Sequence, residues 1–149
     1  MAFTLNYDDA IPLDAEGLAE GGIAEAYERL LPELRKFINN PAARIDEYLD
    51  NDAPNYSVRC GESRFEIYAP DLDKEHGNSW GRATVALFAI VNEQLQGATH
   101  RLYAINGGND LFGMFLTPTD ASAAQKSLPN KTDWPYLPKN EVPWYGQYH

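Results

Sequence analysis

The sequence predicts one α+β domain with a central antiparallel sheet of about four or five strands and helices packed on it. Three observations lead to this prediction: two pairs of short apolar runs that flank turn residues, stretches with helical periodicity, and a length of 149 residues. A chain of this length buries a substantial core without disulfides. Residues 1–149 are therefore assigned to a single globular domain, in which residues 128–149 form an extended tail.

The clearest hairpin is expected in the second half of the chain. Apolar runs over residues 102–105 and 111–116 flank residues 106–109, where two glycines can take the positive φ of a tight reversal. Thr117 then precedes Pro118, and a capping hydroxyl before a proline at the first helical position is typical of a helix start. We expect a strand, a turn, a strand and a helix.

A second hairpin is expected where residues 56–60 and 64–69 surround the turn residues 61–63. Its second arm alternates between two faces, with Phe65, Ile67 and Ala69 on one side and Arg64, Glu66 and Tyr68 on the other. This alternation is typical of a strand with one buried face. Residues 2–7 also alternate and are expected to form a short edge strand.

Three helices are expected before the clearest hairpin. Residues 23–38 have an amphipathic pattern, and Pro32 predicts a kink or break near residues 29–31. Asn40 and Pro41 then resemble the cap and first residue of a second helix. Its apolar face would hold Ile45, Tyr48 and Leu49.

The third helix is expected over residues 80–95, with Ser79 as its cap and Gly97 as its stop. Residues 83–91 are apolar on nearly every side, which predicts burial against the sheet. The tail, residues 128–149, contains four prolines and two Trp-containing clusters. We expect it to lie extended over the domain, anchored by Trp134, Tyr136, Leu137, Trp144 and Tyr145.

The negative charge is concentrated in the first half of the chain. Residues 1–79 hold 17 Asp or Glu against 7 Lys or Arg, a net charge of −10, whereas residues 80–149 hold 5 of each. This distribution disfavours nucleic acid and anionic lipid as direct partners, because both are bound through Lys and Arg. A basic protein partner fits better, although acidity can also serve solubility alone.

The composition is compatible with a cytoplasmic protein. The single cysteine, Cys60, has no internal disulfide partner, and no run approaches the length of a membrane span. The first residues lack the basic and apolar segments of a secretion signal.

No catalytic, cofactor or metal motif is found. The histidines, His76, His100 and His149, do not have metal-ligand spacing. Cys60 lies at a predicted strand end, so a structural thiol is favoured over a nucleophile. Carboxylate pairs such as Asp71 with Asp73 lie in polar runs that lack the closed cleft of a general acid. We therefore expect a protein that is not an enzyme and has no cofactor.

The stretch YAINGGNDLFGMFLTPTDASAAQKSL, followed by KTDWPYLP, resembles small bacterial immunity proteins that accompany secreted polymorphic or type VI toxins. The likeness begins at Arg101 and extends to the C-terminus. It implies an inhibitor that binds a cognate toxin and blocks its active site. An acidic surface would suit a basic toxin, since complementary charge speeds encounter and rejects wrong partners.

The partner-binding surface is expected in the acidic half of the chain. The expected residues are two acidic groups and two aromatic anchors: Asp71, Asp73 and Glu75 in a loop, Asp46, Glu47, Asp50 and Asp52 in a cluster, and Tyr48 and Tyr68. Two alternatives stay open. One is a small enzyme or ligand-binding domain with a pocket between the sheet and the aromatic tail, and the other is a structural subunit of a larger assembly.

Overall fold

Two antiparallel sheets of three strands each make up the β structure of the computed structural model, which describes residues 5–50, 55–69 and 78–149. Sheet A has the order β1-β6-β5 and contains β1 (Ile11–Pro12), β6 (Phe112–Leu116) and β5 (Arg101–Ile105). Sheet B has the order β2-β3-β4 and contains β2 (Asp46–Asp50), β3 (Asn55–Cys60) and β4 (Ser63–Tyr68). The predicted α+β class is confirmed, but the strands form two small sheets in place of one sheet of four or five.

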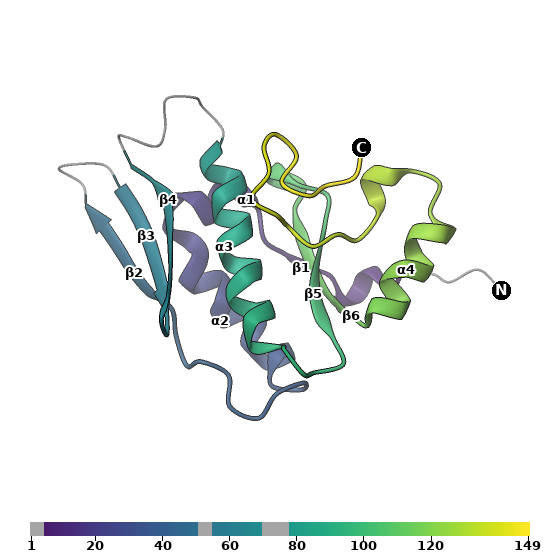
Figure 1. Ribbon diagram of the computed structural model, residues 1–149, viewed down its shortest axis with the longest axis horizontal. Coiled ribbons are helices and arrows are strands. Elements are labelled where there is room, and N and C mark those ends of the chain that lie inside the picture. The colour runs from purple at the N-terminus through teal and green to yellow at the C-terminus, as the bar shows by residue number, and fades with distance from the viewer. Residues whose placement is uncertain (1–4, 51–54, 70–77) are drawn as a thin grey trace.

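Helices α2 (Ile23–Leu34) and α3 (Asn78–Gln94) lie between the two sheets, and α4 (Pro118–Ser127) lies on the far side of sheet A (Figure 1). One apolar cluster joins the inner face of sheet B, both helices and the inner face of sheet A, with Tyr56, Tyr27, Phe88 and Leu102 among its buried members. Helix α3 is therefore flanked by protein on both sides. This position explains why residues 83–91 are apolar on nearly every side, and it confirms the predicted buried helix.

The hairpin of β5 and β6 is confirmed and buries both of its faces. Leu102 and Ala104 belong to the cluster around α3, whereas Tyr103 and Ile105 belong to a second cluster under α4. The reversal places Asn106 (φ 58°) and Gly108 (φ 59°) in the left-handed region. Gly107 is extended with φ −164°, so only one of the two glycines supplies the positive φ that was expected.

Helix α4 begins as the sequence predicts. The backbone N–H of Asp120 donates to the Thr117 hydroxyl at 3.1 Å, and Pro118 occupies the first helical turn. Ala121 and Ala124 pack beneath the helix against Met114 and Leu116 of β6. The helix thus covers the face of sheet A that points away from α3.

The sequence predicts a kink or a break near residues 29–31, and the helix has no break there. Helix α2 continues through Pro32 to Leu34, and the irregular backbone lies before the helix, at Glu20 and Gly21 (φ 94°), after α1 (Ala15–Gly17). Proline at this place removes one hydrogen bond close to the helix end, and the burial of Leu30, Leu31 and Leu34 holds the last turn against the core.

The helix expected to begin at Asn40 and Pro41 is also wrong, because residues 46–50 form strand β2. They pair with β3 in the register Asp46 to Arg59, Tyr48 to Ser57 and Asp50 to Asn55. Pairing with a neighbouring strand outweighs a weak local helix signal here. The hairpin of β3 and β4 is confirmed.

The strand expected at residues 2–7 lies partly in residues 1–4, outside the described ranges. Tyr7–Asp9 forms a 3₁₀ turn that is capped by the Asn6 side chain. The edge strand β1 comes later, at Ile11–Pro12, where it pairs with Gly113 and Phe112 of β6. Residues 5–7 are therefore not a strand.

The tail lies over one end of the molecule, between α3 and α4, and contains only a 3₁₀ turn (Lys131–Asp133) and a single bridge (Figure 1). Tyr136 and Tyr145 are buried, and a Cβ on Gly81 of α3 would lie 2.1 Å from the Tyr145 ring. Leu137 and Trp144 are exposed by 41% and 47%. The extended tail is confirmed, but only two of the five expected anchors are buried.

Candidate functional site

The uncovered face of sheet B is the candidate interaction site. In the described part of the chain, no helix or strand lies on the side of β2, β3 and β4 that faces away from α2 and α3 (Figure 1). Residues opposite one another in the register share a face, which places two rows on this side. The first row is Asp46, Arg59 and Arg64, and the second is Tyr48, Ser57 and Glu66.

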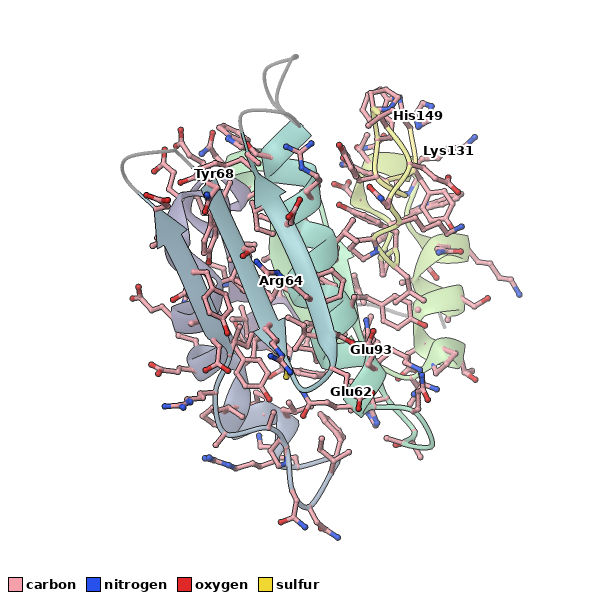
Figure 2. The ribbon with its side chains drawn as sticks, turned by 60° about the vertical axis from the view of Figure 1, so that its left-hand side comes forward. Glu62, Arg64, Tyr68, Glu93, Lys131 and His149 are labelled. Carbon is pink, nitrogen blue, oxygen red and sulfur yellow. The ribbon has the colours of Figure 1, made fainter. Side chains whose placement is uncertain are left out.

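Arg64 joins these two rows near the middle of the face (Figure 2). Its guanidinium carbon lies 5.4 Å from the centroid of the Tyr48 ring, within the range of a cation–π contact. One guanidinium nitrogen also donates to the Ser57 hydroxyl at 3.2 Å. Ser57 is buried, while Tyr48 is 43% exposed. The contact with Arg64 therefore holds an exposed aromatic ring in a defined position.

The charges on this face are mixed. Asp46, Asp50 and Glu66 are exposed carboxylates, and Arg59 and Arg64 lie between them. Asp46 is also 3.4 Å from the Arg44 guanidinium, with both side chains exposed. The predicted acidic cluster is therefore a polar face in which two arginines partly offset the carboxylates. Sequence reasoning missed Arg59 because its position opposite Asp46 depends on β2 being a strand.

Glu47 lies on the core-facing side of β2, unlike its neighbours. Its carboxylate accepts the Tyr56 hydroxyl, and the same hydroxyl accepts the backbone N–H of Ile23 at 3.2 Å. Burial is the largest cause that raises the pKa of Tyr56 above its ordinary value, and the hydrogen bond to Glu47 is the second largest. Glu47 thus ties β2 to the start of α2, and the structure gives it a packing role.

Tyr68 lies against the core, although alternation along β4 predicted the polar face. Tyr56 pairs with Tyr68 and Ser57 pairs with Glu66, so Ile67 is an extra residue in β4. Such a bulge resets the alternation. Tyr68 consequently packs at the margin of the core, with its ring centroid 6.0 Å from that of Tyr56.

The remaining predicted contact residues are not located by the structure. Asp52, Asp71, Asp73 and Glu75 fall outside the described ranges. Of the predicted residues, the structure brings Asp46, Tyr48 and Asp50 together on one face of one strand.

A hollow lies under the tail, where the sequence left a pocket open as an alternative. It has a volume of about 160 Å³ and is bounded by the first turns of α3, the β5–β6 turn and the last residues of the tail. Its lining combines aromatic rings with backbone and amide groups, including Trp80, Gly107, Tyr136, Trp144 and Gln147. The Tyr136 hydroxyl donates to the Asn106 carbonyl at 2.7 Å, and burial raises the pKa of Tyr136 to about 12.

The groups that could act as nucleophile or base have local structural contacts. Cys60 is half-buried against the core, and burial, with the nearby carboxylates of Glu93 and Asp46, raises the pKa of its thiol. A raised pKa lowers the fraction of reactive thiolate at neutral pH. His100 stacks on Phe37 at a centroid distance of 4.2 Å.

In residues 5–50, 55–69 and 78–149, no three His, Cys, Asp or Glu side chains are grouped so that they could hold a metal ion. None of the helices there combines the length and apolarity that crossing a bilayer requires.

Comparison with known proteins adds no relative from which a residue role could be transferred. No family model matches the sequence, and neither the curated proteins nor the solved structures contain a significant match to it.

Proposed function

We propose that the protein is a non-catalytic inhibitor that neutralises a cognate bacterial toxin by binding it through the uncovered face of sheet B. The observation that carries the proposal is the exposed Tyr48 ring, fixed by Arg64 among charged side chains on a sheet face without a covering layer in the described ranges. Tyrosine and arginine are enriched among the residues that dominate binding energy at protein interfaces. Because the ring is already positioned, little side-chain entropy is lost when a partner covers it.

The charge distribution supports a basic partner. The excess of carboxylates lies in residues 1–79, which include α2 and sheet B. A basic toxin, such as a nuclease, would be attracted by this field and oriented toward the acidic half. The proposal places the protein in the cytoplasm, as the immunity partner of a secreted, type VI-like toxin, with neither nucleic acid nor membrane as a direct partner.

The proposal is tested by co-expression with the product of the adjacent reading frame. Rescue of growth and co-purification of the two chains are expected for the wild-type protein. Tyr48→Ala should weaken both, since it removes the exposed ring at the centre of the face. Tyr7→Ala is a matched control, because Tyr7 is a similarly exposed tyrosine beside sheet A. Equal rescue by both variants would argue against sheet B as the interface, and an adjacent product that is harmless by itself would argue against neutralisation of that product.

A ligand-binding role is the second candidate, and the hollow under the tail is the observation that favours it. A volume of about 160 Å³ is close to that of an engineered cavity that accepts a single benzene ring. The aromatic side chains could stack on a sugar or a base. A thermal-shift screen with monosaccharides and nucleotides tests this role, because a ligand that binds only the folded state raises the melting temperature. If the rise in melting temperature is lost in the Trp144→Ala variant but retained in the Tyr48→Ala variant, the ligand binds in the hollow.

A further inference from the structure

The outer edges of the four outermost strands differ in how they are covered. At β5, the Asn92 side chain accepts the Leu102 N–H at 2.8 Å and donates to the Leu102 carbonyl at 3.0 Å. Two residues on, Ala104 exchanges hydrogen bonds of 2.8 and 2.9 Å with Tyr136 of the tail. A helix side chain and the tail therefore cover the edge of sheet A at β5.

Arginines contact the edges of β4 and β1. Arg82 of α3 donates to the Ile67 carbonyl of β4 at 2.6 Å. Arg29 of α2 donates to the Pro12 carbonyl of β1 at 2.8 Å. Both contacts leave less of the backbone available for pairing with another chain.

The edge of β2 is different. Within residues 5–50, 55–69 and 78–149, β2 pairs with β3 on one side and no strand or bridge lies on its other side. Its apolar side chains are also unusually accessible, Tyr48 by 43% and Leu49 by 56%. An open edge with accessible apolar side chains is a surface to which an extended segment can add as a further strand.

We propose that an extended basic segment of the protein partner adds to β2 as a fourth strand of sheet B. This inference rests on the proposed function and specifies how the partner is recognised. Asp46, Tyr48 and Asp50 share one face of β2, because alternate residues of a strand point the same way. A complementary segment has three alternate residues that face these side chains: Lys or Arg opposite Asp46, an apolar residue opposite Tyr48, and Lys or Arg opposite Asp50. The pattern is symmetrical, so it fits a parallel or an antiparallel segment.

The charges select this occupant over a second copy of the chain. Antiparallel pairing of two β2 strands centred on Tyr48 would place Asp46 of each copy opposite Asp50 of the other. Like charges directly opposite one another destabilise strand pairing, whereas opposite charges stabilise it. A charged edge is also the usual protection against self-association, so the same residues that reject a copy accept a basic strand.

The probe is a blocked seven-residue peptide with lysine at its second and sixth positions, isoleucine at its fourth and threonine elsewhere. Titration into the isotope-labelled full chain, followed by amide chemical shifts, should show changes concentrated at residues 46–50 and their partners on β3. A peptide with glutamate in place of lysine should bind at least roughly tenfold more weakly, because attraction at two positions becomes repulsion. Alternate N-methylation along the pairing edge should abolish binding, since it removes backbone donors and keeps the charge.

Protein variants provide the matched comparison. The double variant Asp46→Lys/Asp50→Lys should no longer bind the lysine peptide and should bind the glutamate peptide instead. Glu25→Lys/Glu28→Lys changes the net charge equally at exposed positions of α2 and should leave both titrations unchanged. Equal binding of the N-methylated peptide, shift changes outside sheet B, or equal effects of the two double variants would overturn strand addition. Growth rescue by the adjacent gene pair is scored separately, so a toxin that is neutralised without peptide binding rejects this mode of recognition and leaves the proposed function intact.

Discussion

Sheets A and B have the same number of strands and the same antiparallel pairing, but they differ in what covers them. Sheet A is covered by α3 on one face and α4 on the other, and Tyr136 and Asn92 cover its edge at β5 (Figure 1). Sheet B has α2 and α3 on one face and charged side chains on the other (Figure 2). Both sheets contribute buried side chains to the core, but within the described residues only sheet B has a face and an edge that no other element covers. The proposed function places the partner there.

The largest expected effect comes from truncating a side chain that packs between α3 and sheet A. Phe88 is 1% exposed, and its ring lies next to Gly113 of β6. Phe88→Ala should lower the free energy of unfolding by about 3–5 kcal/mol, because the cavity left in the core cannot collapse fully. Denaturant unfolding measures the loss. Phe88→Leu is the control and should cost clearly less; similar losses for both would show that packing against sheet A is not the source.

Alkaline pH should affect the edge of sheet A through Tyr136. Its pKa is raised from 10.0 to about 12, so above pH 10 the unfolded chain releases this proton more readily than the folded chain. Stability therefore falls as pH rises. Between pH 10 and 12 this group contributes a loss of up to about 3 kcal/mol. Tyr136→Phe should remove that part of the pH dependence, while costing about 1 kcal/mol at neutral pH through the lost hydrogen bond to Asn106. Unfolding curves at several pH values measure this dependence. Parallel plots of unfolding free energy against pH for the wild type and Tyr136→Phe would contradict the prediction.

A smaller effect is expected at the helix that covers the outer face of sheet A. Thr117→Ala removes the hydroxyl that accepts the Asp120 N–H, which should cost about 1 kcal/mol of unfolding free energy. Thr119→Ala is a matched control, because Thr119 lies two residues later in the first turn of the same helix and its side chain is exposed. Thermal unfolding measures the stability of both variants. Equal losses of unfolding free energy would indicate that the Thr117 cap does not stabilise α4.

The smallest expected effect on stability is at the uncovered face of sheet B. Tyr48→Ala should change the unfolding free energy by less than about 1 kcal/mol, since it loses one exposed cation–π contact and opens no cavity. Under the proposed function, the same variant should weaken binding to the partner protein. A loss of several kcal/mol in denaturant unfolding would mean that Tyr48 supports the fold, and the contrast between the two sheets would then fail.

Much of the fold could be predicted where local signals agree with tertiary packing. The Thr117–Pro118 cap, the buried helix over residues 83–91 and both hairpins follow from short-range patterns, and the structure contains all of them. The prediction failed at residues 46–50, where a few apolar residues match a helix face as well as a strand. Only the neighbouring β3 decides between the two conformations.

The candidate site was predictable only in part for the same reason. Asp46, Tyr48 and Asp50 were expected in a binding surface, but their shared face and the cation–π contact with Arg64 depend on cross-strand register. Tyr68 was expected on the polar face, yet an extra residue in β4 turns it toward the core. A bulge of one residue is hard to predict from the sequence, because the residues that form it are of the same types as those in a regular strand.

The sequence by itself determined the α+β class, the acidic first half and the helix and hairpin boundaries that rest on caps, turns and periodicity, since these depend on neighbours a few residues away. Tertiary structure alone decided the division into two sheets, the different covering of their faces and the edge of β2, which pairs with no further strand within the described residues. Those features depend on which distant segments pair and pack, and the free energy of such contacts is gained only when the whole chain is folded.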